Sequence, residues 1–217
     1  MNAYNGRTAG MVIAVCAVLI VAALALHPSV GSAPFSAALL AEIVRLAPMD
    51  RAVHGALMVM LYALVFAMVI FSLRAGLHHP PVLLGLIAYI ASTLFFTGAA
   101  VVDGFIIPDI ASRYVSAPPQ LLSGSHHLLV LCALAIQALT KLGVVAASTA
   151  LLSWSLQLVH TAGAFRLTGA LGIAAAVASL ALTAGVRQLT PHSIGAIFLL
   201  QSVWLLAIAG LLISERL

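Results

Sequence analysis

Histidine and aspartate side chains stand near the ends of the apolar segments of this sequence. His54 lies just inside one such segment, Asp103 lies near the end of the next, and His126 and His127 open the one after it. Imidazole is the commonest metal ligand near neutral pH, and a carboxylate completes many sites for zinc, copper or iron. Because a polar group within an apolar segment is costly unless it is used, these four residues are the candidate ligands of a metal site.

The elements that must position these side chains are helices that cross a membrane. Hydrophobic residues make up 64% of the 217 residues and charged residues 6%, against about 25% charged residues in a soluble domain. The apolar runs are about 20 residues long, which fits a helix across a hydrocarbon core about 30 Å thick. We therefore predict an all-α integral membrane protein, a single transmembrane domain over residues 1–217 with six spans at residues 8–26, 52–73, 82–107, 128–153, 167–186 and 194–213.

The alternating direction of neighbouring spans brings the polar residues to one membrane face. The first, third and fifth spans end where the second, fourth and sixth begin, and five of the eight histidines and four of the five acidic residues share this face. These residues are His27, His54, His126, His127, His192, Glu42, Asp50, Asp103 and Asp109. Packing of the second, third and fourth spans would bring His54 and Asp103 together with one histidine of the pair at 126–127.

Two ligand sets stay open at this face. Adjacent helical residues point about 100° apart, so only one of His126 and His127 would face inward. Met58 lies one turn after His54 and carries a thioether, which favours copper(I). Alternatively, His54 and His127 ligate a b-type haem from two helices. The sequence contains no HxxxH, HExxH or CxxC spacing, and the histidines also fit a purely interfacial role as amphipathic side chains.

Two connections between spans carry features of their own. Ser36 can cap, and Pro48 can end, a short interfacial helix over residues 35–46 in the first outer loop. The connection over residues 103–127 is long, and long loops are often lids or functional elements. All nine prolines fall outside the predicted spans, so we expect the spans to be mostly unbroken helices.

Lys141 is a second chemical feature, because it falls near the middle of the fourth predicted span. Gln137 lies one turn before it, and Gln201 lies in the sixth span. An ionisable residue at this depth is a functional candidate by default, as a proton relay or as a contact for an anionic lipid or substrate. A tilted or displaced span that lets Lys141 reach a polar pocket in a structural role fits the sequence equally well.

The positions of the basic residues predict the orientation of the protein in the membrane and the class of partner that it binds. The predicted loops carry four arginines at each face, and the expectation of cytoplasmic N and C termini rests on Arg7 and Arg74, which lie in very short segments beside spans. The metal site would then open at the outer face of a bacterial inner membrane. The basic residues form no cluster of the kind that binds nucleic acid. We expect membrane lipid as a partner and leave open a membrane protein partner or a homo-oligomer.

Four functions are compatible with these features. The first is a transition-metal or haem protein in redox chemistry or metal handling, and the second is a small transporter or channel that uses Lys141. The third is an intramembrane metal-dependent lipid hydrolase, and the fourth is a non-catalytic membrane subunit. The residue pattern leaves open whether the chain is an enzyme. The first and third functions both depend on His54 and His127 lying close enough to share one ion.

Overall fold

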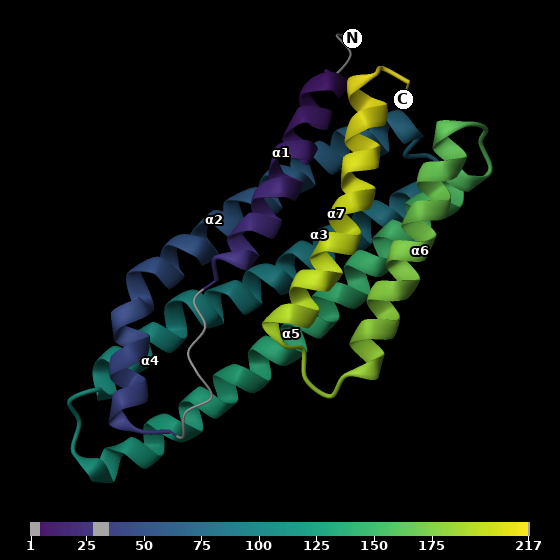
Figure 1. Ribbon diagram of the computed structural model, residues 1–217. Helices are drawn as coiled ribbons and strands as arrows, with labels where there is room; N and C mark the ends of the chain where they lie inside the picture. Colours follow the sequence, from purple (N-terminus) through teal and green to yellow (C-terminus); the bar gives the residue numbers. More distant parts are fainter. Residues whose placement is uncertain (1–4, 28–34, 217) are drawn as a thin grey trace.

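Helices account for nearly all of the structure, a computed structural model that describes residues 5–27 and 35–216 (Figure 1). In chain order the elements are α1 (Gly6–Ala25), α2 (Ala37–Ala75), α3 (Pro80–Val101), η1 (Val102–Ile106), α4 (Ile107–Tyr114), α5 (Pro119–Val159), α6 (Ala164–Gly185) and α7 (Pro191–Ile213). The π-helical turn η1 joins α3 to α4 in one continuous rod. Within the described residues, six helical segments are long and apolar enough to cross a membrane. This confirms the all-α bundle of six spans and a multi-pass membrane protein.

The bundle combines three short helices with three long ones. The helices α1, α6 and α7 have 20, 22 and 23 residues, which corresponds to about 30–35 Å of helix. The helix α2 has 39 residues, the rod from α3 to α4 has 35, and α5 has 41, so each of them exceeds about 50 Å. Both chain termini lie at one end of the bundle, and the long helices extend past the short ones at the other end (Figure 1).

The short helix predicted over residues 35–46 is the first part of α2. Ser36 caps it as expected, because its Oγ accepts a hydrogen bond of 3.3 Å from the backbone N–H of Leu39. The prediction that Pro48 ends this helix is wrong, because α2 continues through Pro48 to Ala75. Proline removes one backbone donor and kinks a helix, and Figure 1 shows α2 changing direction in its first part.

The long loop predicted over residues 103–127 is also mostly helical. The turn η1 and helix α4 occupy its first half, and only residues 115–118 separate α4 from α5. Pro108 follows η1, and in a regular α-helix its ring would clash with the carbonyl four residues earlier. The wider π turn, in which the N–H of Ile107 donates to the carbonyl of Val102, lets the rod continue past this proline.

An aromatic cluster packs the half of the bundle that is nearer the chain termini. Trp154 and Trp204 stack with ring centroids 5.8 Å apart, and Phe71 meets both rings edge-on. All three side chains are fully buried, and aromatic pairs of this kind contribute about 0.5–1.5 kcal/mol beyond the burial of area. Gly85 is required beside Trp154, because a Cβ there would lie 2.7 Å from the indole Nε1. This packing fixes α2, α3, α5 and α7 relative to one another.

Candidate metal centre

Three side chains from three parts of the chain converge where the long helices pass the ends of the short ones. His27 follows α1, His54 lies in α2 and Asp103 lies in η1. The two histidine Nε2 atoms are 3.3 Å apart. Asp103 Oδ2 lies 3.4 Å from Nε2 of His54 and 3.6 Å from Nε2 of His27. The side chain of His54 is only 5% exposed, so the group is anchored inside the protein.

The separations between these three atoms suit a bound metal ion. Bonds from zinc to nitrogen or oxygen are about 2.0–2.1 Å long in tetrahedral sites, which places neighbouring ligand atoms about 3.3–3.4 Å apart. The three atoms therefore form a triangle close to one face of such a tetrahedron. The group that could hold an ion consists of these three residues, so the described parts of the chain place no further histidine, cysteine, aspartate or glutamate at the fourth corner.

The hydrogen bond made by Nδ1 of His54 influences which ring nitrogen carries the proton, and so whether Nε2 can bind a metal ion. Nδ1 of His54 lies 2.9 Å from the backbone oxygen of Asp50 and 3.0 Å from its Oδ1. Nδ1 donates a hydrogen bond to the backbone oxygen, so it carries a proton, and Nε2 presents a lone pair whenever the imidazole is neutral. Oδ1 of Asp50 is buried beside the ring without a hydrogen-bond partner in the described structure. Nε2 of His54 lies 3.3 Å from Nε2 of His27 and 3.4 Å from Oδ2 of Asp103, so a single metal ion, or shared protons, would satisfy the three atoms. A carboxylate behind the imidazole is the usual supporting contact in metal sites.

Replacing Asp50 by asparagine is expected to weaken metal binding about 10–100-fold, the usual cost of losing such a supporting contact. The amide keeps the size of the side chain but removes its charge. Calorimetric titration of the purified variant with zinc measures the effect. Asp109→Asn is the matched control, because that carboxylate is 62% exposed and pairs with Arg51 instead. Equal losses of affinity in both variants would contradict the role of Asp50.

Gly104 allows α2 and η1 to approach closely enough for this contact. A Cβ at position 104 would lie 2.5 Å from Cβ of His54 and 2.8 Å from its Nδ1. Gly55 is the chain neighbour of His54, and a Cβ there would meet no atom within 4 Å. The π turn of η1 also shifts Asp103 out of the register of a regular α-helix. Turns of this type are frequent at functional sites.

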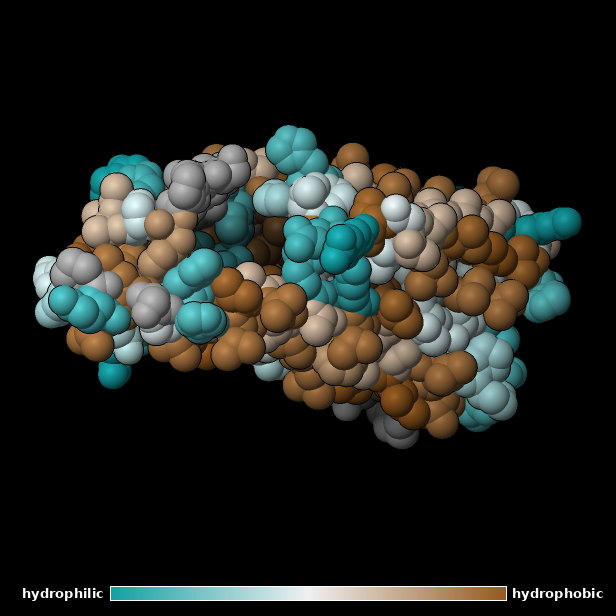
Figure 2. Space-filling model, turned by 90° about the horizontal axis from the view of Figure 1, so that it is seen from below, coloured by the Kyte–Doolittle hydropathy of each residue, from teal (hydrophilic) through white to brown (hydrophobic). Residues whose placement is uncertain are grey.

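A cavity of about 520 Å³ adjoins the three ligands. His27, His54 and Asp103 form part of its wall, and most of the remaining lining residues are apolar. Figure 2 looks into a hollow on this side of the molecule, with both hydrophilic and hydrophobic residues around it. The volume lies within the range of about 300–1,000 Å³ for small-molecule sites. A molecule in this cavity would contact the three ligand atoms.

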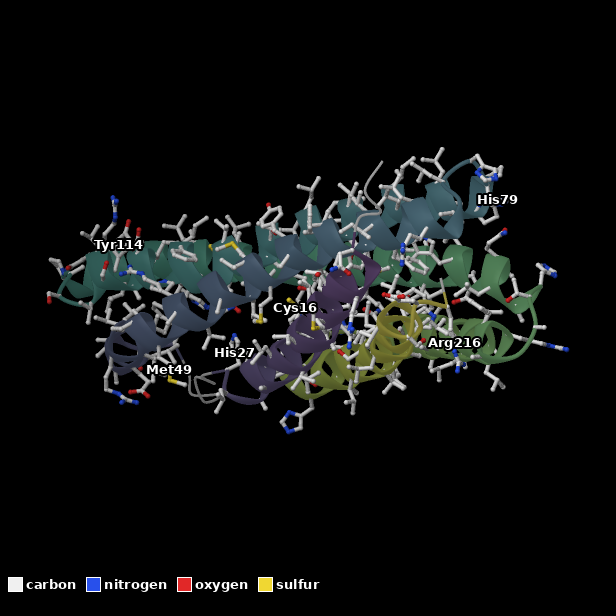
Figure 3. The ribbon with its side chains drawn as sticks, turned by 90° about the horizontal axis from the view of Figure 1, so that it is seen from above. Cys16, His27, Met49, His79, Tyr114 and Arg216 are labelled. Carbon is white, nitrogen blue, oxygen red and sulfur yellow. The ribbon has the colours of Figure 1, made fainter. Side chains whose placement is uncertain are left out.

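The structure does not bring the other two predicted ligands into the group. His126 and His127 are exposed on α5, and the ring of His126 stacks on Phe35 with centroids 4.6 Å apart. Sequence reasoning placed His27 at the correct face but did not select it as a ligand; its position just after the first span is the signal that could have identified it. In Figure 3, His27 lies among the helices, whereas His79 stands at the periphery.

Lys141 and Gln137 bind the connection between α6 and α7. Nζ of Lys141 donates to the carbonyl oxygens of Arg187 at 2.8 Å and of Val186 at 3.4 Å. Gln137 donates to the carbonyl of Leu189 and accepts from its N–H, both at 2.9 Å. Both carbonyls belong to the connection just after α6, where Lys141 satisfies acceptors that have no partner within a helix. Lys141 is therefore level with the end of a short helix, which favours its structural interpretation.

Gln137→Leu is expected to lower the free energy of unfolding by about 1–3 kcal/mol, because two backbone groups would lose their partner. These groups belong to Leu189, which is 3% exposed. Unfolding in detergent, followed by circular dichroism, measures the loss. Gln157→Leu, on the same helix, is the matched control, and metal affinity is expected to stay unchanged in both variants. Equal stability of both variants would show that the contact with Leu189 contributes nothing.

Comparison with known proteins leaves the site to be interpreted from its own geometry. No family model, no curated protein and no solved structure matches the chain. The chemistry of the three ligands and of the adjoining cavity is therefore the basis for a functional assignment.

Proposed function

We propose that this membrane protein binds one divalent transition-metal ion through His27, His54 and Asp103. The observation that carries the proposal is the spacing of the three ligand atoms, 3.3–3.6 Å from one another. The contact between His54 and Asp50 supports it, because it turns the lone pair of Nε2 toward the shared centre.

The donor set suits some metals better than others. Two imidazoles and one carboxylate are ligands that zinc, copper(II) and iron(II) accept. Haem fits less well, because axial nitrogens on opposite sides of one iron are two bonds of about 2 Å apart, with the porphyrin between them. Here Asp103 Oδ2 lies 3.4–3.6 Å from both imidazole nitrogens, in the space that the porphyrin would need.

The open fourth position favours a catalytic centre. Structural zinc sites are closed by four protein ligands, whereas catalytic sites have three and keep one position for water or substrate. A metal ion in such a site activates water or polarises a carbonyl group. We therefore favour a metal-dependent hydrolase that acts on a membrane-borne molecule. The transporter alternative loses support, because Lys141 is engaged by backbone carbonyl oxygens.

The proposal includes a location. We place both termini in the cytoplasm of a bacterial cell and the metal centre at the outer face of its inner membrane. This orientation is supported by Arg7 and Arg74, which lie at the end of the bundle that carries the termini, and by the positive-inside rule.

Elemental analysis of the protein purified in detergent tests the metal assignment. We expect about one zinc, copper or iron ion per chain, a stoichiometry that follows from one set of ligands. An apoprotein prepared with a chelator should take up cobalt(II) and develop visible absorption bands of a four-coordinate site. Failure to bind zinc, copper, iron or cobalt after reloading would overturn the proposal.

A further inference from the structure

The cavity beside the ligands is polar at one end and closed by aromatic rings at the other. Three residues that line the cavity are each seven positions along the chain from a candidate ligand. They are Ile20 for His27, Leu61 for His54 and Phe96 for Asp103. Seven residues of helix span about 10 Å. From each candidate ligand to its lining residue, the helix runs toward the end of the bundle that carries the chain termini. The cavity therefore extends along the helix axes from the ligands into the bundle.

Phe96 and Phe198 form the closed end of this cavity. Their ring centroids are 5.0 Å apart, and both residues also line a second cavity of about 20 Å³. Gln201 and Ser202 line that second cavity, and Nε2 of Gln201 is buried without a hydrogen-bond partner in the described structure. Gln201 therefore presents an unpartnered amide to a small, mostly apolar space, which shares Ile20, Leu61 and the two rings with the main cavity.

The α5 wall of the main cavity also faces outward. Val130 and Leu134 both line the cavity, and they are 45% and 59% exposed. Both residues precede Lys141 on α5, so this exposed part of the wall lies at the same end of the bundle as the three candidate ligands. A hydrocarbon chain could therefore enter the cavity at that end, beside the metal centre, and extend into the bundle.

We propose that the main cavity binds the hydrocarbon chain of an acyl compound, with its carbonyl oxygen at the metal centre and about 10 Å of chain between the ligands and the closed end. This inference rests on the proposed metal site. The apolar lining favours a hydrocarbon, since apolar area removed from water is the main source of affinity, and few polar atoms are free to bind a sugar or a nucleotide. Gln137, one of the polar residues in the wall, has both ends of its amide bonded to Leu189. The carbonyl group is the part that a metal ion can polarise.

Photo-crosslinking in lipid nanodiscs tests the proposal. The zinc-loaded full chain is exposed to a fatty acid whose diazirine lies about 10 Å along the chain from its carboxyl group, and in a second arm to a lysophospholipid that carries the same acyl chain. We expect labelling at Phe96, Phe198 or their neighbours with at least one of the two probes. The more strongly labelling probe distinguishes a free acid from an acyl ester. Labelling confined to residues outside the cavity would overturn the proposal.

Substitutions in the wall separate specific binding from general lipid contact. Ala133 lines the cavity, and Ala133→Phe is expected to lower labelling at the closed end about tenfold by excluding part of the chain. Ala138→Phe is the matched control, because Ala138 is exposed on the same helix and lies outside the lining. Phe198→Ala joins the two cavities and is expected to shift preference toward longer chains. Unchanged labelling in Ala133→Phe would contradict the proposal.

Metal content measured on the same samples distinguishes a failure of the acyl-chain proposal from a failure of the metal-site proposal. Ala133→Phe should retain its metal, so a loss of labelling there reports on chain binding alone. Chelation of wild-type protein should weaken labelling at the closed end, because the carbonyl group loses its anchor. If labelling is equal with and without metal, the carbonyl is not at the metal and the proposal fails, while the metal site itself stands. Absence of metal under all conditions contradicts the metal site independently of the labelling.

Discussion

Replacing His54 by alanine is expected to abolish stoichiometric metal binding, with a loss of affinity greater than about 100-fold. Removal of a supporting contact alone costs about 10–100-fold, and this substitution removes a direct ligand. His54 is also the most buried member of the group, with 5% of its side chain exposed, so no solvent-exposed side chain can readily take its place. Metal content after purification and calorimetric titration with zinc measure the loss.

The two histidines selected from sequence but left outside the group serve as matched controls. His126→Ala and His127→Ala remove the same chemical group from exposed positions on α5. Both variants should keep one metal ion per chain and the affinity of the wild type. If His127→Ala loses metal as His54→Ala does, the ligand set is the one predicted from sequence and the assignment of His27 is incorrect.

Helix direction alone predicted a large part of this site. Because neighbouring spans alternate, His54 near the start of one span and Asp103 near the end of the next had to lie at the same end of the bundle. The structure places Oδ2 of Asp103 3.4 Å from Nε2 of His54. His27, at the end of the first span, lies at this end of the bundle for the same reason. Helix direction therefore predicted the face at which all three candidate ligands lie, but not which side chains contact one another.

Hydropathy did not predict the full length of α5, and this explains why His126 and His127 were selected as candidate ligands although they lie outside the group. The fourth span was predicted to begin at residue 128, whereas α5 begins at Pro119. The α5 residues that line the cavity lie between Val130 and Thr140. His126 and His127 therefore lie about one turn beyond the cavity, on the part of α5 that extends past the short helices.

The same difference in length explains the position of Lys141. A span of ordinary length centred on this residue would place it in the middle of the bilayer. In the structure, Lys141 is level with the connection after α6 and donates to the carbonyl of Arg187. Hydropathy reports that a segment is apolar, but the depth of a residue depends on where the neighbouring helices end, and this is a tertiary property.

Proline positions misled the sequence analysis for a local physical reason. A proline after an apolar run normally ends a helix, yet α2 passes through Pro48 and the rod from α3 to α4 passes Pro108. The first interruption is accommodated by a bend and the second by the π turn of η1. That turn carries Asp103, so the feature that sequence reasoning treated as a helix end instead helps to position a ligand.

Gly104→Ala is expected to weaken metal binding about 10–100-fold without changing any ligand, as disturbance of a supporting shell does. The added Cβ would lie 2.5 Å from Cβ of His54, so either the imidazole or the η1 backbone must move. Overpacking of this kind costs about 1–3 kcal/mol of stability, which exceeds the gain of about 0.5–1 kcal/mol from alanine in a helix. Zinc titration and unfolding in detergent measure the two effects.

Gly55→Ala separates this steric effect from a general effect of glycine in α2. A Cβ at position 55 would meet no atom within 4 Å, so the substitution should retain full metal affinity and raise stability by up to about 1 kcal/mol. The two substitutions thus differ in whether the added methyl group reaches His54. If Gly104→Ala binds zinc as tightly as Gly55→Ala, α2 and η1 are not packed closely enough for His54 and Asp103 to share an ion.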